Sequence, residues 1–408
     1  MLGPWPRRMH NTIREYEWGS TTALAELQGR EPSGRPEAEL WMGAHPSDPS
    51  RVDVDGTHPA GLDALITEHP RELLGEAAYR QFGARLPFLF KVLAIGHPLS
   101  LQVHPTAERA RTVFEGQAQA YSEHRYVDPY AKPELIYALE PMDALSGFRA
   151  AKQAADLFTL LDGERAAAIV ALLSDPGLDE TRRLESALRA LVTWPDADRA
   201  ALAGDVAERS QAVLGRRQLD PADHRAFAWA VRLAGEYPLD PMVAAPFLLD
   251  LVRLEPGEVM FLPAGAPHAY LNGIGVEIMA NSDNVLRAGL TSKPIAVEEM
   301  LHIVDGQSRP VRDVPQLVLG PHEVAWTPPV PDFRLGRVRT ADAEPVALHP
   351  APAGPQVLLC IAGPVTLCGA DPSTALRLEP GQSAFVGADA GLLTMAGPGE
   401  LFRATTGG

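Results

Sequence analysis

The sequence has few cysteines, no long apolar run and fewer basic than acidic residues. Two cysteines, Cys360 and Cys368, are too few for a disulfide framework and fit a reducing cytoplasm. No apolar stretch is long enough to span a membrane, and the amino-terminal residues lack the apolar segment of a secretory signal. Lysine and arginine number 36 against 52 acidic residues, and a net charge of −16 argues against a nucleic-acid partner. We therefore expect a cytoplasmic protein that binds neither membranes nor nucleic acids.

The residue composition and hydrophobic spacing change twice along the 408 residues of the chain, a length that suits two or three domains. Short apolar runs separated by Pro and Gly, typical of strands and turns, fill residues 1–150. Residues 151–240 are rich in Ala, Leu, Arg and Glu with helical spacing, as at Leu184, Leu188 and Leu191. The strand texture returns in 241–315 and 316–408. The pattern predicts a mainly β protein with an inserted α-helical domain.

A weak internal repeat links the last two segments. The sequence LEPGEVMF at residues 254–261 is echoed by LEPGQSAF at residues 378–385. Where the first copy continues to His268, the second has Leu392. We expect a fold unit that occurs twice, with polar chemistry in the first copy only.

The first copy carries a further motif. Gly257, Pro263, Gly265, His268 and Asn272 match the spacing G-x5-P-x-G-x2-H-x3-N at every fixed position, which resembles the second motif of the cupin superfamily. Gly and Pro favour a tight turn, so His268 is expected on the returning strand, facing the interior. The interior of a small β-barrel that holds a ligand need not be apolar. The resemblance implies cupin (jelly-roll) barrels.

The stretch LSLQVHP, residues 99–105, alternates apolar and polar side chains. Leu101 and Val103 are predicted to face a core, so Gln102 and His104 share the opposite face of a strand. At this spacing their side chains can converge on one ion.

Lys132 and Glu134 in AKPELIYAL are also two residues apart, separated by Pro133. Taken alone, the two side chains are expected to pair with each other at the surface. Glu134 could instead join His104, His268 and Gln102 around a metal. A set of two nitrogens and two oxygens suits Zn²⁺, and Mn²⁺, Fe²⁺ or Co²⁺ also fit such donors.

Matching motifs along most of the chain identify a family. The chain resembles the type I mannose-6-phosphate isomerases (phosphomannose isomerases) in YEWGS, AELWMGAHPSDPS, LPFLFKVL, LSLQVHP, KPELIYAL, ALSGFR, LEPGEVMFLPAGAPHAYL and VEIMANSDNVLRAGLTSKP. The resemblance implies one zinc ion held by Gln102, His104, Glu134 and His268, and a catalytic arginine at Arg287. It also implies other pocket residues, which are Trp18, Lys91, Ser100, Lys132, Tyr270, Glu277, Asp283 and Lys293. One departure is Ala131, where many family members have a histidine.

The implied reaction interconverts mannose 6-phosphate and fructose 6-phosphate through an enediolate, whose negative oxygen needs stabilisation. Arg287 suits that task because a guanidinium keeps its charge. Lys132 and Glu277 are both candidates for the proton carrier. Ser100 and Lys293, with Lys91 as a further candidate, are expected to bind the phosphate.

Structural roles compete with several of these assignments. Glu277 and Arg287 could form a buried ion pair that orders the pocket. Asp283 could cap a turn, and Trp18 and Tyr270 could be wall residues.

Two rival functions remain on the sequence alone, a metalloenzyme acting on another small molecule and a non-catalytic sugar-phosphate sensor. Each would take a small-molecule partner. The basic residues around the expected pocket favour a phosphosugar. A single sequence shows no interface, and we expect a monomer.

Overall fold

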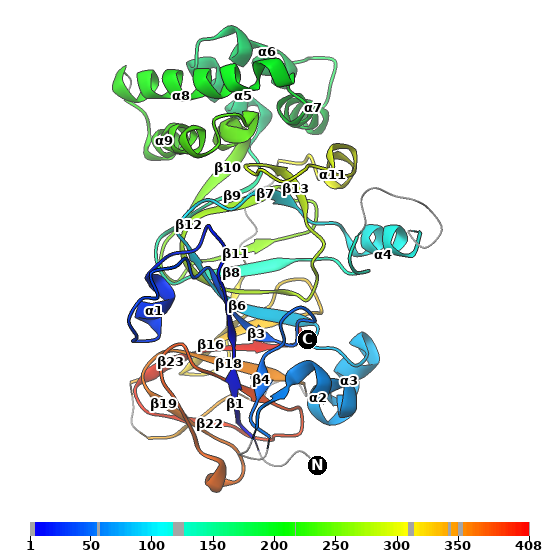
Figure 1. The fold of residues 1–408 in the computed structure, drawn as a ribbon, viewed down its shortest axis with the longest axis vertical. Helices are drawn as coiled ribbons and strands as arrows, with labels where there is room; N and C mark the ends of the chain where they lie inside the picture. The colour runs from blue at the N-terminus through cyan, green and yellow to red at the C-terminus, as the bar shows by residue number, and fades with distance from the viewer. Residues whose placement is uncertain are drawn as a thin grey trace.

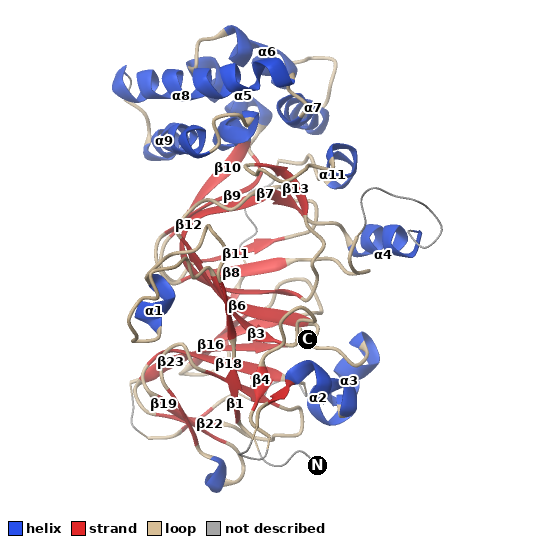
Figure 2. Ribbon diagram, in the orientation of Figure 1, coloured by secondary structure: helices blue, strands red, loops and turns tan. Residues whose placement is uncertain are grey.

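The computed structural model describes residues 5–54, 58–116, 126–216, 218–308, 314–341, 344–349 and 354–407. These residues form three β-sheets and a group of helices at one end of the molecule (Figure 1), and all pairings between the named strands are antiparallel. Figure 2 shows that sheet dominates the rest of the molecule. None of the helices in the described ranges is long and apolar enough to cross a membrane. The expectation of a mainly β protein with helices is confirmed at this level.

The largest sheet has ten strands in the described part of the chain. Six of them follow the order β10-β9-β12-β6-β3-β2, and β7, β8, β11 and β13 join this path through β12. The strands are β2 (Thr12–Arg14), β3 (Glu39–Gly43), β6 (Phe88–Ile95), β7 (Leu101–Val103), β8 (Glu134–Ala138), β9 (Met142–Phe148), β10 (Leu249–Leu254), β11 (Val259–Leu262), β12 (His268–Ala280) and β13 (Leu286–Gly289).

Strand β12 holds the ten-stranded sheet together because it changes partners along its length. Its first residues pair with β7 and β9, whereas its last residues pair with β6 and β8. At the change, Gly273 has a φ of 106°, and a Cβ there would lie 2.5 Å from Cγ of Met142. The Asn272 side chain accepts a hydrogen bond from the Asp143 backbone N–H at 2.8 Å where the register shifts. Glycine and asparagine thus bend the strand at this irregularity.

The bend lets the sheet curl around a small apolar cluster. Leu93, Ile136, Met142, Leu254 and Met260 come from five different strands and all pack in this cluster. We call the face of the sheet that carries these residues the inner face. Every second residue along each of these strands points to this face.

Two different apolar cores cover the outer face of the same sheet, one at each end. Phe88, Phe90 and Val92 of β6 pack into the core shared with the carboxy-terminal segment. Leu101 and Val103 of β7 pack into the core of the helices, as their alternation predicts. The ten-stranded sheet is therefore clamped between two apolar cores, which makes it a rigid support for the side chains on its inner face.

The helical group forms the second of these cores. Leu184, Leu188 and Leu191 lie on one buried face, as their spacing predicts. The Asp220 side chain accepts hydrogen bonds from the backbone N–H groups of Ala222 and Asp223, and Pro221 is the first helical residue, so the predicted helix start is confirmed. The helices are α5 (Ala151–Leu160), α6 (Glu164–Leu173), α7 (Glu180–Val192), α8 (Arg199–Arg216), α9 (Pro221–Glu236) and α10 (Ala245–Leu248), with the 3₁₀ turns η1 (Asp196–Asp198) and η2 (Pro241–Ala244).

A nine-stranded sheet lies at the other end of the molecule, in the order β14-β15-β16-β23-β18-β21-β1-β4-β5. Strand β1 lies near the start of the sequence and pairs with β21 near its end. Residues 1–150 therefore contribute strands to two sheets. The strands are β1 (Arg7–His10), β4 (Arg51–Val52), β5 (Ala60–Gly61), β14 (Gln316–Val318), β15 (Glu323–Trp326), β16 (Arg334–Thr340), β18 (Gln356–Ala362), β21 (Ser383–Val386) and β23 (Gly399–Thr405).

A four-stranded sheet and several short helices complete the fold. The sheet has the order β17-β22-β19-β20 and consists of β17 (Val346–Ala347), β19 (Val365–Cys368), β20 (Leu376–Leu378) and β22 (Thr394–Ala396). The helices are α1 (Ala23–Leu27), α2 (Leu62–Glu68), α3 (Pro70–Phe82), α4 (Ala107–Gly116), α11 (Val297–Ile303) and the 3₁₀ turn η3 (Pro372–Thr374). Both cysteines are free, and Cys360 is buried.

The two LEPG sequences form matching turns. Gly257 and Gly381 both have positive φ, 100° and 77°. In each turn the residue after the glycine donates its backbone N–H to the glutamate carbonyl, at 2.9 and 3.0 Å. Its side chain in turn accepts from the N–H of that glutamate, at 2.8 and 3.0 Å. The expected repeat is therefore present in the local structure of both turns.

The nine-stranded sheet contains a buried ion pair. Arg403 donates to Glu323 and to Gln356, each at 2.8 Å, and also to the carbonyl of His349. The side chains of Arg403 and Glu323 are 2% and 4% exposed. Each charge is thus matched by groups that the surrounding strands provide.

We expect Arg403→Met to lower the free energy of unfolding by about 3–5 kcal/mol, because it leaves the Glu323 carboxylate buried without its partner. Urea unfolding of the full chain measures this change. Lys152→Met is the matched control, because Lys152 pairs with Asp156 at 2.7 Å with 84% of its side chain exposed, and exposed pairs contribute less than about 1 kcal/mol. Equal losses for the two variants would contradict the prediction.

Candidate metal centre

A row of polar side chains crosses the inner face of the ten-stranded sheet. Arg287 on β13 lies directly opposite Gln102 on β7, and Gln102 lies opposite His268 on β12. His268 in turn lies opposite Ser146 on β9. Directly opposed residues of antiparallel strands point to the same face. Their apolar neighbours Leu101 and Leu286 pack against the helices on the outer face.

Two imidazoles and one carboxylate meet beside this row. His104 Nε2 is 3.2 Å from one oxygen of Glu134, and His268 Nε2 is 3.5 Å from the other. The three residues are 2–4% exposed, and their candidate ligand atoms all lie within 4.8 Å of one another. His104, Glu134 and His268 are hereafter the His–Glu–His cluster.

Backbone carbonyls fix the orientation of both rings. His104 Nδ1 is 3.0 Å from the carbonyl of Asn284, and His268 Nδ1 is 2.9 Å from that of Ala266. Because a carbonyl only accepts, each Nδ1 carries the hydrogen and each Nε2 presents a lone pair to the cluster. Burial lowers the pKa of His104 to about 4 against the opposing effect of Glu134, so the ring is neutral near pH 7.

This donor set fits a divalent metal. His104 Nε2 is a buried atom without a hydrogen-bond partner among the described residues, which is costly unless something else satisfies it. Metal-bound histidines ordinarily donate their second N–H to a carbonyl or carboxylate, as both rings do here. Two neutral imidazoles and a carboxylate are ligands that zinc and neighbouring divalent ions accept.

The turn before His268 joins the backbones of the two histidines. Gly265 has a φ of 83°, and its N–H donates to the carbonyl of His104 at 2.9 Å. A Cβ at this position would lie 3.1 Å from Cβ of Asp305. Glycine is therefore required both by the conformation and by the close packing. The motif predicted the turn, and the structure adds its link to His104.

Glu134 is ionised within this cluster. Burial by itself would raise its pKa, but the Lys132 ammonium opposes burial, and the pKa of Glu134 lies well below its usual range. Lys132 Nζ is 3.0 Å from Glu134, and its side chain is 12% exposed. The predicted pairing of these two residues is present, but it lies inside the site and not on the surface.

A second charged cluster lies next to the first on the inner face. Lys91 Nζ is 2.6 Å from Glu277 and 3.8 Å from Glu39. Tyr270 donates to the other oxygen of Glu277 at 3.1 Å. Burial raises the pKa of Glu277, which Lys91 partly offsets, and burial also raises the pKa of Tyr270. The nearby charges raise the pKa of Lys91, although burial opposes them.

The comparisons with known proteins agree over almost the whole chain. The sequence pattern of a family described as "Phosphomannose isomerase type I, catalytic domain" matches residues 7–151. The mannose-6-phosphate isomerase of Escherichia coli (strain K12) is 38% identical over 405 residues, 97% of this chain and 98% of the relative. The chain belongs to the type I mannose-6-phosphate isomerase family. The bovine (Bos taurus) member of the family is 31% identical, with 96% of each chain covered.

Solved structures of the family share the fold. A variant of the phosphomannose isomerase from Salmonella typhimurium superposes with a TM-score of 0.86 at 34% identity, covering 98% of this chain and 99% of that one. A mannose 6-phosphate isomerase bound with zinc and yttrium superposes with a TM-score of 0.84 at 33% identity, with the same coverage.

The other residues that the family resemblance implied occupy different surroundings. Among the described residues, Arg287 has no carboxylate within 4 Å of its guanidinium, so the ion pair considered between Glu277 and Arg287 is absent. Glu277 pairs with Lys91 instead. Ser100 directly precedes β7, in phase with Gln102, and is partly exposed. Lys293 is exposed.

Two further residues lie at the edges of the site. Trp18 packs against the apolar cluster of the inner face. Asp283 is 3.3 Å from Nε2 of His45, and this contact holds the pKa of Asp283 below its usual value.

The sequence interpretation missed two site residues. His45 is buried, contacts Asp283 and packs edge-on against Trp41 at 4.8 Å between ring centroids. Glu39 provides the second carboxylate around Lys91. Both occur in AELWMGAHP, one of the stretches that resemble the family, where a glutamate and a histidine among mostly apolar residues were the available signal. Ala131 lies beside Lys132 with no titratable side chain of its own.

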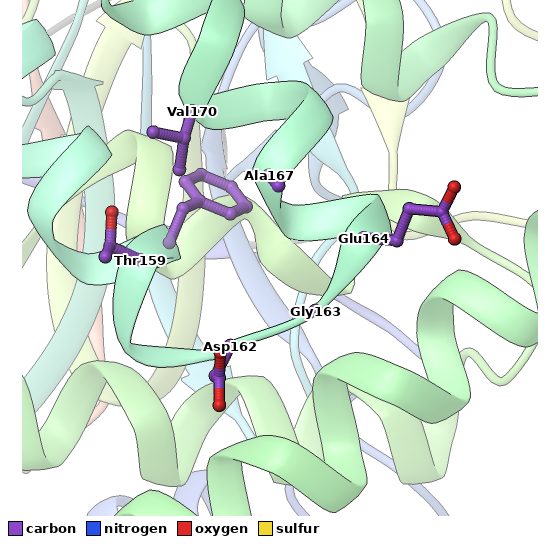
Figure 3. A pocket seen from close by; sticks show the side chains of 7 residues that line it. Thr159, Asp162, Gly163, Glu164, Ala167 and Val170 are labelled. Atoms are coloured by element: carbon purple, nitrogen blue, oxygen red, sulfur yellow. The ribbon is translucent and has the colours of Figure 1, made fainter.

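The helical group contains a separate hollow of about 390 Å³ at the connection between α5 and α6 (Figure 3). Its lining lacks histidine, lysine and arginine, and consists of Phe158, Thr159, Asp162, Gly163, Glu164, Ala167 and Val170. Figure 1 places α5 and α6 at the end of the molecule away from β8. The chemistry of the inner face therefore does not extend to this hollow.

We expect His268→Ala to remove most of the divalent metal from the purified protein, because it deletes one of the three donors of the His–Glu–His cluster. Elemental analysis of desalted protein for zinc, manganese, iron and cobalt measures this loss. His97→Ala is the control, because the side chain of His97 is 63% exposed and lies outside the cluster. Stoichiometric metal in the His268→Ala protein would remove His268 from the ligand set.

Proposed function

We propose that this chain is a zinc-dependent isomerase that interconverts mannose 6-phosphate and fructose 6-phosphate. The buried His–Glu–His cluster carries the proposal, in a chain related over 97% of its length to the mannose-6-phosphate isomerase of Escherichia coli. A related structure was solved with zinc bound. The charged residues of the inner face suit an anionic sugar substrate. We propose that the enzyme is a monomer and place it in the cytoplasm.

Gln102 is proposed as the fourth metal ligand. Its support is the strand register, in which Gln102 lies opposite His268 and shares its face, the face that carries the His–Glu–His cluster. One carboxylate and three neutral ligands leave a formal charge of about +1 on a bound divalent ion. When bound there, such an ion would supply Lewis-acid polarisation of the carbonyl of the open-chain sugar.

The remaining residues divide the work of moving a proton between C1 and C2. Arg287, free of any described carboxylate partner, is proposed to stabilise the negative oxygen of the enediolate, since its charge persists through the reaction. Glu277 and Lys132 are the candidates for the proton carrier. Lys91 holds Glu277 in place through their 2.6 Å contact, and this role accounts for Lys91 better than phosphate binding does.

The phosphate group is assigned to Ser100 and Lys293. Lys293 is exposed and follows β13, which carries Arg287. Ser100 precedes β7, the neighbour of β13 in the sheet. A hydroxyl and an ammonium at this edge provide the donors that a phosphate needs. Trp18, Tyr270 and Asp283 are proposed to line the pocket.

We further propose that the fold consists of two jelly-roll barrels of the cupin type. Residues 1–150 and 241–315 would build the first around the metal, residues 316–408 the second without metal ligands, and residues 151–240 an inserted helical domain. Support comes from the curled ten-stranded sheet, the matching LEPG turns and the run of helices from α5 to α9. The pairing of β1 with β21 extends the second unit by an amino-terminal strand.

We expect the zinc-loaded protein to convert mannose 6-phosphate into fructose 6-phosphate, detected by a coupled assay for the ketose. Arg287→Ala should lower kcat/KM by about 10²-fold or more, a loss typical of removing a group that stabilises an oxyanion. Arg253→Ala is the control, because Arg253 is a partly exposed residue on β10 that pairs with Asp143 and Glu255. Absence of conversion by metal-replete protein would refute the proposed function.

The pH–rate profile separates the two candidates for the proton carrier. If Glu277 is the base, it must be ionised, so activity falls as the pH drops through its raised pKa. Glu277→Gln should then abolish this acid limb together with most of kcat, whereas Lys132→Ala should keep the limb. The opposite pattern would assign the base to Lys132, and near-native rates in both variants would exclude both residues.

A further inference from the structure

Two loops that precede site residues are joined by an unusually dense set of hydrogen bonds. One loop, residues 126–130, leads to Lys132 and Glu134. The other, residues 281–284, leads from β12 to Arg287. The loops are far apart in sequence, and their contacts centre on two side chains, Asp128 and Asn284.

Asp128 gathers four donors. Its Oδ1 accepts from Ser282 Oγ at 2.9 Å, from the Tyr130 N–H at 2.9 Å and from Asn284 Nδ2 at 3.0 Å. Its Oδ2 accepts from the Asp283 N–H at 2.9 Å. An ionised carboxylate can accept this many hydrogen bonds, and charge-assisted bonds are stronger than neutral ones. The carboxylate therefore fixes the backbone of both loops.

Asn284 completes the link from the other side and is 3% exposed. Its Nδ2 lies 2.7 Å from the Asp128 carbonyl and 2.9 Å from the Tyr130 carbonyl, in addition to the Asp128 carboxylate. Its Oδ1 accepts from the Val127 N–H at 3.0 Å. Three acceptors around Nδ2 and one donor at Oδ1 leave a single orientation of the amide that satisfies every partner.

The backbone carbonyl of the same residue contacts the metal cluster. It accepts from Nδ1 of His104, which leaves His104 Nε2 as the lone-pair donor. The side chain of Asn284 thus holds the loop, and the loop holds the carbonyl that sets the tautomer and the ring plane of His104.

We propose that Asn284, held by Asp128, is a positioning residue that orients His104 toward the metal and ties this ring to the loop that leads to Lys132. The inference rests on the proposed metal site but not on the identity of the substrate. The role of Asn284 is carried through its backbone, so substitution of the side chain displaces the carbonyl without deleting it.

The test measures zinc affinity separately from stability. Metal-free protein is titrated with zinc against a chromophoric chelator, and the thermal midpoint of the metal-free protein is recorded alongside. We expect Asn284→Ala to raise the Kd for zinc by about 10–100-fold, the range found when an outer partner of a metal-bound histidine is lost.

Asn11→Ala is the matched control. Asn11 is also an amide with both ends bonded, donating to Ser383 at 2.7 Å and accepting from Ser50 at 2.9 Å, and it lies near β1 and not beside the metal cluster. A purely structural role would lower the thermal midpoint in both variants with no change in the Kd for zinc. A folded Asn284→Ala protein with native zinc affinity would overturn the proposal.

Asp128→Asn provides a second route if Asn284→Ala does not fold. It keeps the shape of the side chain but removes the charge and part of its acceptor capacity, so it should also weaken zinc binding, by a smaller factor. Native zinc affinity in this variant would contradict the proposal. Zinc titration does not depend on turnover, so a protein that lacks isomerase activity but responds to these substitutions would refute the proposed function alone.

Discussion

The site on the inner face of the ten-stranded sheet depends on one buried carboxylate, that of Glu134, and on the groups that compensate for its charge. Removing the Glu134 carboxylate from water is costly unless nearby groups compensate for the lost hydration. Lys132 provides one compensating charge, and the two histidine rings face the two carboxylate oxygens. The His104 ring stays neutral because burial disfavours its protonation. The result is a site where two imidazoles and a carboxylate lie close enough to share one divalent cation.

Strand β12 connects the metal cluster with the second charged cluster, because it carries residues of both. Its amino-terminal half presents His268 and Tyr270, and its carboxy-terminal half presents Glu277, on the same inner face. The bend at Gly273 lies between them. One strand therefore carries a metal ligand and a candidate proton carrier, and the distance between the two is set by a single irregularity. The outer face of each half of β12 packs against an apolar core, the first half against the helices and the second half against the carboxy-terminal segment. This packing holds both halves in place.

Local patterns in the sequence predicted those features that depend on a few neighbouring residues. The alternation around Gln102, the turn before His268 and the helix start at Asp220 are examples, because each follows from strand period, glycine conformation or capping. The partner of Glu277 could not be found in this way. Lys91 and Arg287 are equally basic in a sequence, and only the pairing of β12 with β6 places Lys91 opposite Glu277.

The same reasoning explains why the sequence could not indicate the partner of the amino-terminal strand. Arg7–His10 is followed at once by strands of the ten-stranded sheet, yet it pairs with β21, which lies more than 370 residues away. Likewise, nothing near Asp128 in the sequence indicates Asn284 as its partner. Contacts of this kind depend on the tertiary path of the chain, and local periodicity carries no information about it.

The matching LEPG turns allow the two sheets to be aligned strand by strand, and the alignment gives the ion pair of Arg403 a meaning. Strand pairings place Gln356 at the position of Glu134, Arg403 at that of Glu277 and Glu323 at that of Glu39. Gly336 stands at the position of Lys91. The second sheet thus has its cation on the opposite strand and an amide in place of the ligand carboxylate. The guanidinium of Arg403 on β23 therefore corresponds to the ammonium of Lys91 on β6, the cation of the second charged cluster, carried by the other strand of the pair. A single substitution could not create the His–Glu–His cluster there, since Gln356 stands at the position of Glu134 and, in the alignment of the LEPG sequences, Leu392 stands at that of His268.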